Sequence, residues 1–149
     1  MTFLMIAIGN KIVASASQAY MRHYHIGIMQ WRVMALLAAE PGITATDIAQ
    51  LSGVTAGSVS RAIQALKTRG YVQVRNDRAD NRRVYLRLTA AGRELHDRVV
   101  VSSLARERLL LTGFSRPEHR RMLGYFRRLM VNVALVNAYE PSSGSPQRP

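Results

Sequence analysis

The sequence predicts a mainly α-helical fold that carries one small β-hairpin. Three observations lead to this fold class. Apolar residues recur at helical spacing in the terminal parts of the chain, a helix-turn-helix pattern occupies 44–66, and two alternating runs follow at 71–75 and 84–88. A hairpin directly behind a helix-turn-helix forms a wing, so the expected architecture is a winged helix-turn-helix plus an α-helical dimerisation region.

Two helices are expected before the helix-turn-helix. Over residues 10–24 the apolar stripe repeats every four residues, at Ile12, Ala16, Tyr20 and Tyr24. A second apolar pattern runs over 28–39, and Glu40-Pro41-Gly42 ends it.

Capping residues set the bounds of the first helix of the helix-turn-helix. Thr44 and Asp47 are spaced for a capping box, in which each side chain binds the other residue's backbone. Ile48 and Leu51 are expected to point inward. Gly53 ends the helix because glycine adopts positive φ readily.

The second helix of the pair has one apolar face and one polar face. Val59, Ile63 and Leu66 fall at i, i+4 and i+7 and predict the buried stripe. The other face is therefore expected to meet a ligand or solvent. Its candidate DNA-binding residues are Thr55, Ala56, Gly57, Ser58, Ser60, Arg61 and Gln64.

Positive charge is densest in the predicted hairpin. The whole chain of 149 residues has 21 Lys and Arg against 9 Asp and Glu, a formal charge of +12, which favours a polyanionic partner. Residues 69–87 hold Arg69, Arg75, Arg78, Arg82, Arg83 and Arg87 against Asp77 and Asp80. A membrane-binding helix would spread its bases along an amphipathic face, so this clustering favours DNA.

The hairpin residues have separate expected roles. Arg82 lies near the loop tip and is expected to enter a narrow minor groove. Asp77 and Asp80 are expected to pair with neighbouring arginines and stabilise the wing. The remaining DNA-binding candidates are Arg69, Arg78 and Arg83.

Two more helices are expected after the hairpin. Thr89 caps one that runs to about residue 111, and the capping box Ser115-Arg116-Pro117-Glu118 begins the other. The last helix has an apolar seam at Met122, Phe126, Leu129, Met130, Val133 and Val136. Such a seam in a small chain needs a partner surface, so a homodimer is expected.

The expected organisation has four parts. Residues 1–27 contribute a helix to the dimerisation region, 28–88 form the DNA-binding lobe, 89–139 complete the dimerisation region, and 140–149 form a disordered tail.

Several functional classes are not expected. The chain has no cysteine, which excludes disulfides and thiol ligands, and no basic residue precedes the short apolar run at 3–8, so no signal peptide is expected and the location is cytoplasmic. No nucleophile or phosphate-loop motif indicates an enzyme, and no cofactor or metal is expected. His23 and His25 are the remaining candidates for a metal site. Their spacing of two places them on different helix faces, which disfavours binding of one metal ion by both.

The outer face of the second helix has the chemistry to read bases. Arg61 can donate a bidentate pair to guanine, and Gln64 can pair with adenine. Ser58 and Ser60 can reach phosphates. Two alternatives stay open: this face is an ordinary solvated surface, or the winged helix is a protein-interaction module without specific DNA readout.

The chain resembles the MarR family of bacterial transcriptional regulators. The motifs that carry the resemblance are Gln30-Trp31-Arg32-Val33-Met34, 44–51, Ser58-Val59-Ser60-Arg61, 67–72, 77–83 and Leu88-Thr89-Ala90-Ala91-Gly92. The resemblance implies a homodimer that represses by occupying a pseudo-palindromic operator and is released by a small aromatic or phenolic effector. Arg78 departs from the family, which commonly has Pro there, and the lack of cysteine excludes the peroxide-sensing branch.

The resemblance also implies an effector site between the dimer helices and the DNA-binding lobe. The candidate residues are Tyr20, Arg22, His23, Trp31 and Met34. In this hypothesis Arg22 or His23 anchors a carboxylate while the other side chains contact a ring. The alternative is ordinary core packing beside a polar hinge.

Overall fold

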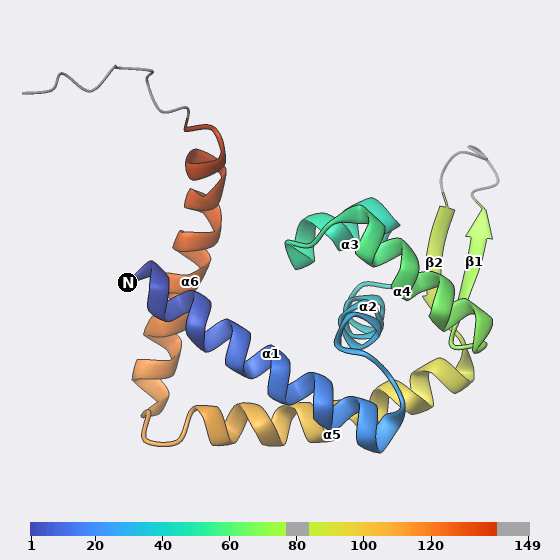
Figure 1. Cartoon of the computed structure of the whole chain (residues 1–149), viewed down its shortest axis with the longest axis horizontal. Helices are drawn as coiled ribbons and strands as arrows, with labels where there is room; N and C mark the ends of the chain where they lie inside the picture. The colour runs from blue at the N-terminus through green and yellow to red at the C-terminus, as the bar shows by residue number, and fades with distance from the viewer. Residues whose placement is uncertain (77–83, 140–149) are drawn as a thin grey trace, which may run out of the picture. The chain divides into compact units, whose positions relative to one another are not determined.

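The computed structural model describes residues 1–76 and 84–139 and has six helices and one hairpin there (Figure 1). The elements in order are α1 (Thr2–Tyr24), α2 (Ile28–Ala39), α3 (Ala45–Ser52), α4 (Ala56–Thr68), β1 (Val72–Asn76), β2 (Val84–Leu88), α5 (Ala90–Leu110) and α6 (Arg116–Asn137). The expected fold class is confirmed. The chain divides into two compact units, Met1–Ala105 and Arg106–Pro149.

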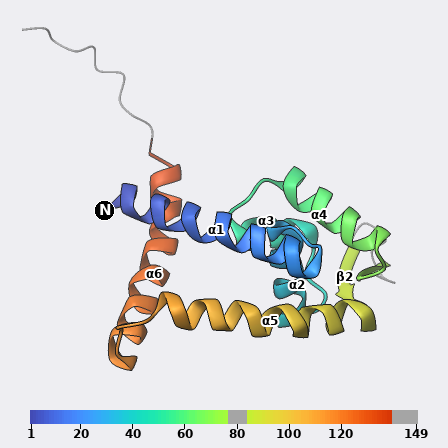
Figure 2. The same cartoon turned by 60° about the horizontal axis from the view of Figure 1, so that its bottom comes forward.

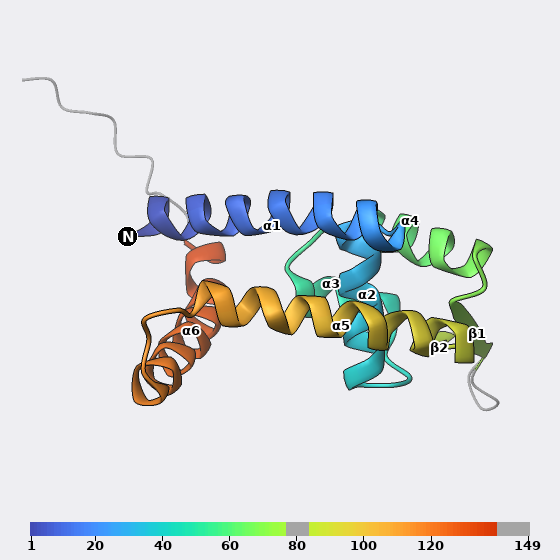
Figure 3. The ribbon, with the colours of Figure 1, turned by 90° about the horizontal axis from the view of Figure 1, so that it is seen from below.

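Helix α2 forms the centre of the first unit. Figure 1 shows α2 end-on beneath α3 and α4, and Figure 3 shows it running from the end of α1 across α5. Its Val33, Met34 and Leu37 are almost fully buried, together with Ile48 of α3 and Leu66 of α4. A helix that is apolar on most of its circumference is stable only inside a core, which explains the central position of α2.

Strand β2 forms backbone hydrogen bonds along both of its edges, and one of these edges attaches the hairpin to the core. Strands β1 and β2 pair antiparallel, with Val72 opposite Leu88 and Asn76 opposite Val84. On its other edge, the backbone of Leu86 exchanges hydrogen bonds with the turn after α2: Gly42 N donates to Leu86 O at 3.1 Å and Leu86 N donates to Ile43 O at 3.3 Å. The base of the wing is therefore fixed relative to α2 and α3.

Most helix bounds follow the local signals. Helix α2 spans the predicted 28–39, and the capping boxes at Thr44 and Ser115 are both present. Gly53 has φ 64° and Gly70 has φ 73°, so both helices of the helix-turn-helix end at a glycine in the left-handed region or immediately before one.

Two expectations about the helices were wrong. Helix α1 begins at Thr2 rather than near residue 10, because Gly9 lowers helix stability without breaking a helix. Leu51 is 54% exposed instead of pointing inward. The inward side of the short α3 is centred on Ile48, Ala49 and Ser52, and at about 100° per residue Leu51 falls outside that arc.

The second unit contains the end of α5 and all of α6. Gly113, with φ 89°, lies in the turn before Ser115 caps α6. No residue of α6 is buried, although the predicted seam lies along it; Phe126 and Met130, for example, are exposed. The tail expected at 140–149 lies outside the described residues. No helix in the described ranges is both long enough and apolar enough to cross a membrane.

Candidate nucleic-acid interface

Local hydrogen bonds build both ends of α3. Thr44 N and Thr44 Oγ1 both donate to Asp47 Oδ2 at 2.8 Å, and Asp47 N donates back to Thr44 Oγ1 at 3.2 Å. Gly53 then reverses the chain, and Val54 N donates to Ala49 O at 3.4 Å. The capping box fixes the start of α3, and the Val54 bond closes the turn that leads into α4.

The buried stripe of α4 holds the helix on the core. Val59 and Leu66 are fully buried, and Ala62 and Ile63 are nearly so. Burying such aliphatic side chains stabilises the folded state by about 1.5–3 kcal/mol each, before chain entropy is counted. The opposite face is held outward as a consequence, and Figure 2 shows α4 along one side of the first unit with α5 along the other.

The outward face of α4 contains the predicted DNA-binding residues. Thr55, Ala56, Gly57, Ser60, Arg61 and Gln64 are exposed, and Ser58 is half-buried. The helix contains no acidic residue, so nothing along it opposes the approach of a polyanion.

A row of hydrogen bonds orders Arg61 on this face. Thr55 Oγ1 donates to Ser58 Oγ at 3.0 Å, and Arg61 Nη2 donates to Ser58 Oγ at 3.3 Å. The three residues are spaced at i, i+3 and i+6, which places them one above another on the helix. The guanidinium is thus drawn toward the N-terminus of α4, where free N–H groups and the helix dipole favour an anion.

Arg69 has two partners within the protein. Its Nη1 donates to the backbone oxygen of His25 at 2.6 Å, and its guanidinium carbon lies 5.0 Å from the ring centroid of Tyr71. Arg69 therefore connects the end of α1 to the segment between α4 and β1. The side chain remains exposed, so this contact lies at the protein surface.

The remaining wing candidates lie outside the described residues. These are Arg78, Arg82 and Arg83, together with the predicted wing-stabilising residues Asp77 and Asp80. Their roles stay predictions.

The predicted effector residues divide into a buried group and an exposed group. Tyr20, Trp31 and Met34 are buried in the core. The ring centroids of Tyr20 and Trp31 lie 5.8 Å apart, and the two rings pack edge-on. Arg22 and His23 are exposed near the end of α1. The structure thus brings Tyr20 and Trp31 together and leaves Arg22 and His23 at the surface.

Two contacts, one to Trp31 and one to Tyr24, were not predicted from the sequence. His96 of α5 stacks on Trp31, with centroids 5.5 Å apart and planes 21° from parallel, and its Nδ1 lies 2.9 Å from Asp97 Oδ1. The guanidinium carbon of Arg98 lies 6.0 Å from the ring centroid of Tyr24. The stack and the cation–ring contact join residues far apart in sequence, and no local pattern indicated them.

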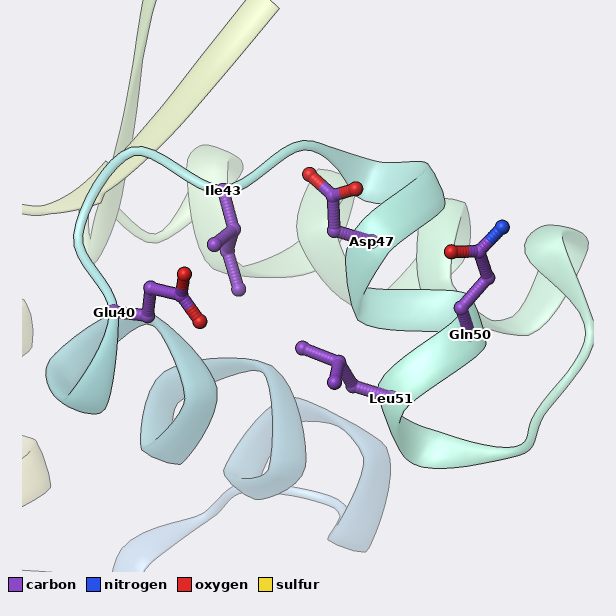
Figure 4. A pocket seen from close by; sticks show the side chains of 5 residues that line it. All are labelled: Glu40, Ile43, Asp47, Gln50 and Leu51. Carbon is purple, nitrogen blue, oxygen red and sulfur yellow. The ribbon is translucent and has the colours of Figure 1, made fainter. Parts of the chain in front are cut away.

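A separate pocket of about 340 Å³ lies between the end of α2 and α3 (Figure 4). It is lined by Glu40, Ile43, Asp47, Gln50 and Leu51. Figure 4 shows Ile43 and Leu51 pointing into the space that the Glu40 carboxylate also faces. The Asp47 carboxylate also caps α3, so this lining residue has a structural role. It contains none of the predicted effector residues.

Comparisons with known proteins find relatives with a helix-turn-helix. The sequence model of the MarR family matches residues 26–83. YdgJ of Bacillus subtilis (strain 168), an uncharacterized HTH-type transcriptional regulator, is 29% identical over 117 residues, which cover 75% of this chain and 70% of that protein.

Solved structures give the same result for the fold. A MarR/EmrR family regulator from Acinetobacter sp. ADP1 has a TM-score of 0.85 and 25% identity, covering 90% of this chain and 94% of its own. MepR of S. aureus, solved in complex with DNA, has a TM-score of 0.76 and 22% identity, covering 89% and 95%. The motifs, the fold and these similarities agree: the chain has the winged-helix fold of the MarR family of transcriptional regulators, whose sequence model matches residues 26–83.

Proposed function

We propose that this chain is a homodimeric repressor that acts in the cytoplasm by binding a pseudo-palindromic operator in duplex DNA. The observation that carries the proposal is the outer face of α4. That face is exposed and free of acidic residues, and Ser58 holds the Arg61 guanidinium toward the N-terminus of the helix. In this proposal Arg61 and Gln64 read bases, while Ser58, Ser60 and the first backbone N–H groups bind phosphates.

The likeness to MepR supports binding to DNA, because that regulator was solved with DNA bound and has the same fold. The proposed wing contacts are Arg78, Arg82 and Arg83, with Asp77 and Asp80 as stabilising partners. Their dense charge would place a cationic loop beside the phosphates that flank the major groove.

The homodimer is supported by the apolar surface of α6. Leu123, Phe126, Met130, Val133 and Val136 are exposed along the helix, and Leu135 and Tyr139 add to the exposed area. Exposed apolar area of this kind marks an interaction surface. A two-fold axis would set two copies of α4 into successive major grooves, roughly 34 Å apart.

The proposal includes a small aromatic or phenolic effector that releases the protein from DNA. Arg22 is exposed on α1 two positions after the buried Tyr20, whose ring contacts Trp31. In this proposal Arg22 pairs with the carboxylate of an aromatic acid. Calorimetry with a panel of aromatic acids tests this, comparing the wild type with Arg22→Ala and, as a control, Arg93→Ala. We expect heat of binding in the wild type and the control but not in Arg22→Ala; absence of heat from every protein would contradict an effector of this class.

The experiment that tests DNA binding is selection of bound duplexes from a random pool, followed by a salt titration. The proposal predicts two enriched half-sites about one helical turn apart and affinity for random duplex that falls steeply with salt. The alternative, a winged helix that binds protein, predicts no enriched sequence and a flat salt response. That second pair of results would overturn the proposed function.

A further inference from the structure

The end of α1 has an unusual backbone conformation. His25 caps α1 with φ 56° and ψ 33°, and among the described residues it is the one non-glycine residue with positive φ. Its N–H closes back onto α1, with a hydrogen bond to Met21 O at 3.1 Å. The left-handed cap turns the chain toward Ile26 and leaves the His25 carbonyl as an acceptor for a residue from elsewhere.

Arg69 supplies the donor from the end of α4. It is the C-cap of α4, and its own N–H donates to Ala65 O at 3.2 Å. Its side chain donates to His25 O at 2.6 Å across 44 positions in the sequence, and the ring of Tyr71 lies against its guanidinium. A cation between two helix C-termini is favoured by both helix dipoles.

The start of α5 is tied to the same segment. Thr89 Oγ1 donates to Gly70 O at 2.6 Å, and Thr89 N donates to Tyr71 O at 3.0 Å. The ends of α1 and α4 and the beginning of α5 therefore meet at residues 69–71, all within the first unit. We call this group, His25, Arg69, Gly70, Tyr71 and Thr89, the helix junction.

We propose that Arg69 is a positioning residue, which sets the orientation of α4 on α1 through the His25 carbonyl, and that it does not contribute a phosphate contact. The inference rests on the proposed function, because the orientation of α4 matters only if α4 enters DNA. Without the bond to His25, the end of α4 is free to adopt orientations that do not match the groove. The apparent affinity for DNA is then the intrinsic affinity multiplied by the fraction of molecules in which α4 is correctly oriented.

The test compares Arg69→Ala with two variants at the other end of the bond. His25→Gly keeps the left-handed cap at no steric cost, whereas His25→Val disfavours it because a β-branched residue rarely adopts positive φ. We expect Arg69→Ala and His25→Val each to weaken binding to the selected duplex about tenfold, and His25→Gly to bind like the wild type. The double variant, Arg69→Ala with His25→Val, should lose no more than either single variant, because both remove one connection.

The salt dependence separates positioning from phosphate contact. Loss of a phosphate contact reduces the magnitude of the negative slope of log K against log salt by about 0.9, whereas loss of orientation leaves the slope unchanged. An unchanged slope in Arg69→Ala, together with the matching loss in His25→Val, is the expected result. A smaller slope in Arg69→Ala with wild-type affinity in His25→Val would overturn the inference while leaving the proposed function intact, and so would wild-type affinity in Arg69→Ala. Failure of the wild type to bind any duplex would overturn both.

Discussion

Gly92 lies directly against the backbone carbonyl of Tyr71, so close that a Cβ atom at position 92 would overlap with the carbonyl oxygen. Thr89 N donates to the same oxygen at 3.0 Å, and Thr89 Oγ1 accepts from Gly92 N at 3.0 Å. The first turn of α5 is therefore pressed onto the segment that joins α4 to the wing. The small residue at 92 permits this approach.

Replacing Gly92 with alanine should destabilise the protein by about 1–3 kcal/mol, the usual cost of over-packing. Alanine favours a helix by up to about 1 kcal/mol, but the obstructing atoms belong to backbone and cannot rotate away. Denaturant unfolding measures the effect. Gly9→Ala in α1 is the matched control, because a Cβ atom at position 9 would have no neighbouring atom within 4 Å, and it should leave stability unchanged or raise it. Equal stability of the two variants would contradict this role for Gly92.

The α6 seam should control self-association. Val133→Asp introduces a charge into the exposed apolar face, so we expect the dimer dissociation constant to rise at least about tenfold, since burying an unpaired charge is costly. Sedimentation velocity over a range of concentrations measures this. Arg121→Glu, an exposed change on the arginine-bearing side of α6, should leave association almost unchanged. A monomeric wild type at every concentration would contradict the proposed homodimer.

The pKa of Glu118 should depend on the cap of α6. Ser115 Oγ donates to Glu118 Oε2 at 2.6 Å and Ser115 N donates at 2.8 Å, and these bonds hold the pKa of Glu118 below its ordinary value. Because the folded pKa is the lower one, the stabilisation is present above the unfolded pKa and is lost as pH falls through the folded pKa.

Ser115→Ala removes the side-chain donor and should raise the pKa of Glu118 toward its ordinary value, whereas Ser115→Thr should keep it low. An NMR titration of the Glu118 carboxyl carbon gives both values. The explanation fails if the pKa is the same in the alanine variant as in the wild type.

Local signals in the sequence predicted the helix-turn-helix well. Capping boxes at Thr44 and Ser115 and the left-handed Gly53 act within a few residues, so helix bounds could be predicted from them. The prediction that Leu51 points inward was wrong, because periodicity gives the apolar side of a short helix only approximately. The predicted start of α1 was wrong because the helix continues through Gly9 to Thr2, ahead of the apolar stripe from which it was predicted.

Contacts between distant residues could not be predicted in the same way. The stack of His96 on Trp31 and the bond from Arg69 to His25 depend on how helices pack, and neither has a spacing that a sequence pattern reveals. Arg69 was expected at the DNA because it begins an arginine-rich segment. Its contact with the His25 carbonyl depends on how the ends of α1 and α4 pack together, which no local pattern specifies.

The most direct test of the account is the base preference of Arg61→Ala compared with Lys67→Ala. Both residues are exposed cations on α4, but only Arg61 lies in the row with Thr55 and Ser58. Affinities for the selected duplex and for single-base variants of it are measured by fluorescence anisotropy. We predict that Arg61→Ala loses about 1–3 kcal/mol on the selected duplex and no longer discriminates at one position of each half-site, while Lys67→Ala keeps the preference. Equal losses on every duplex, or an unchanged preference in Arg61→Ala, would contradict base reading by the outer face of α4.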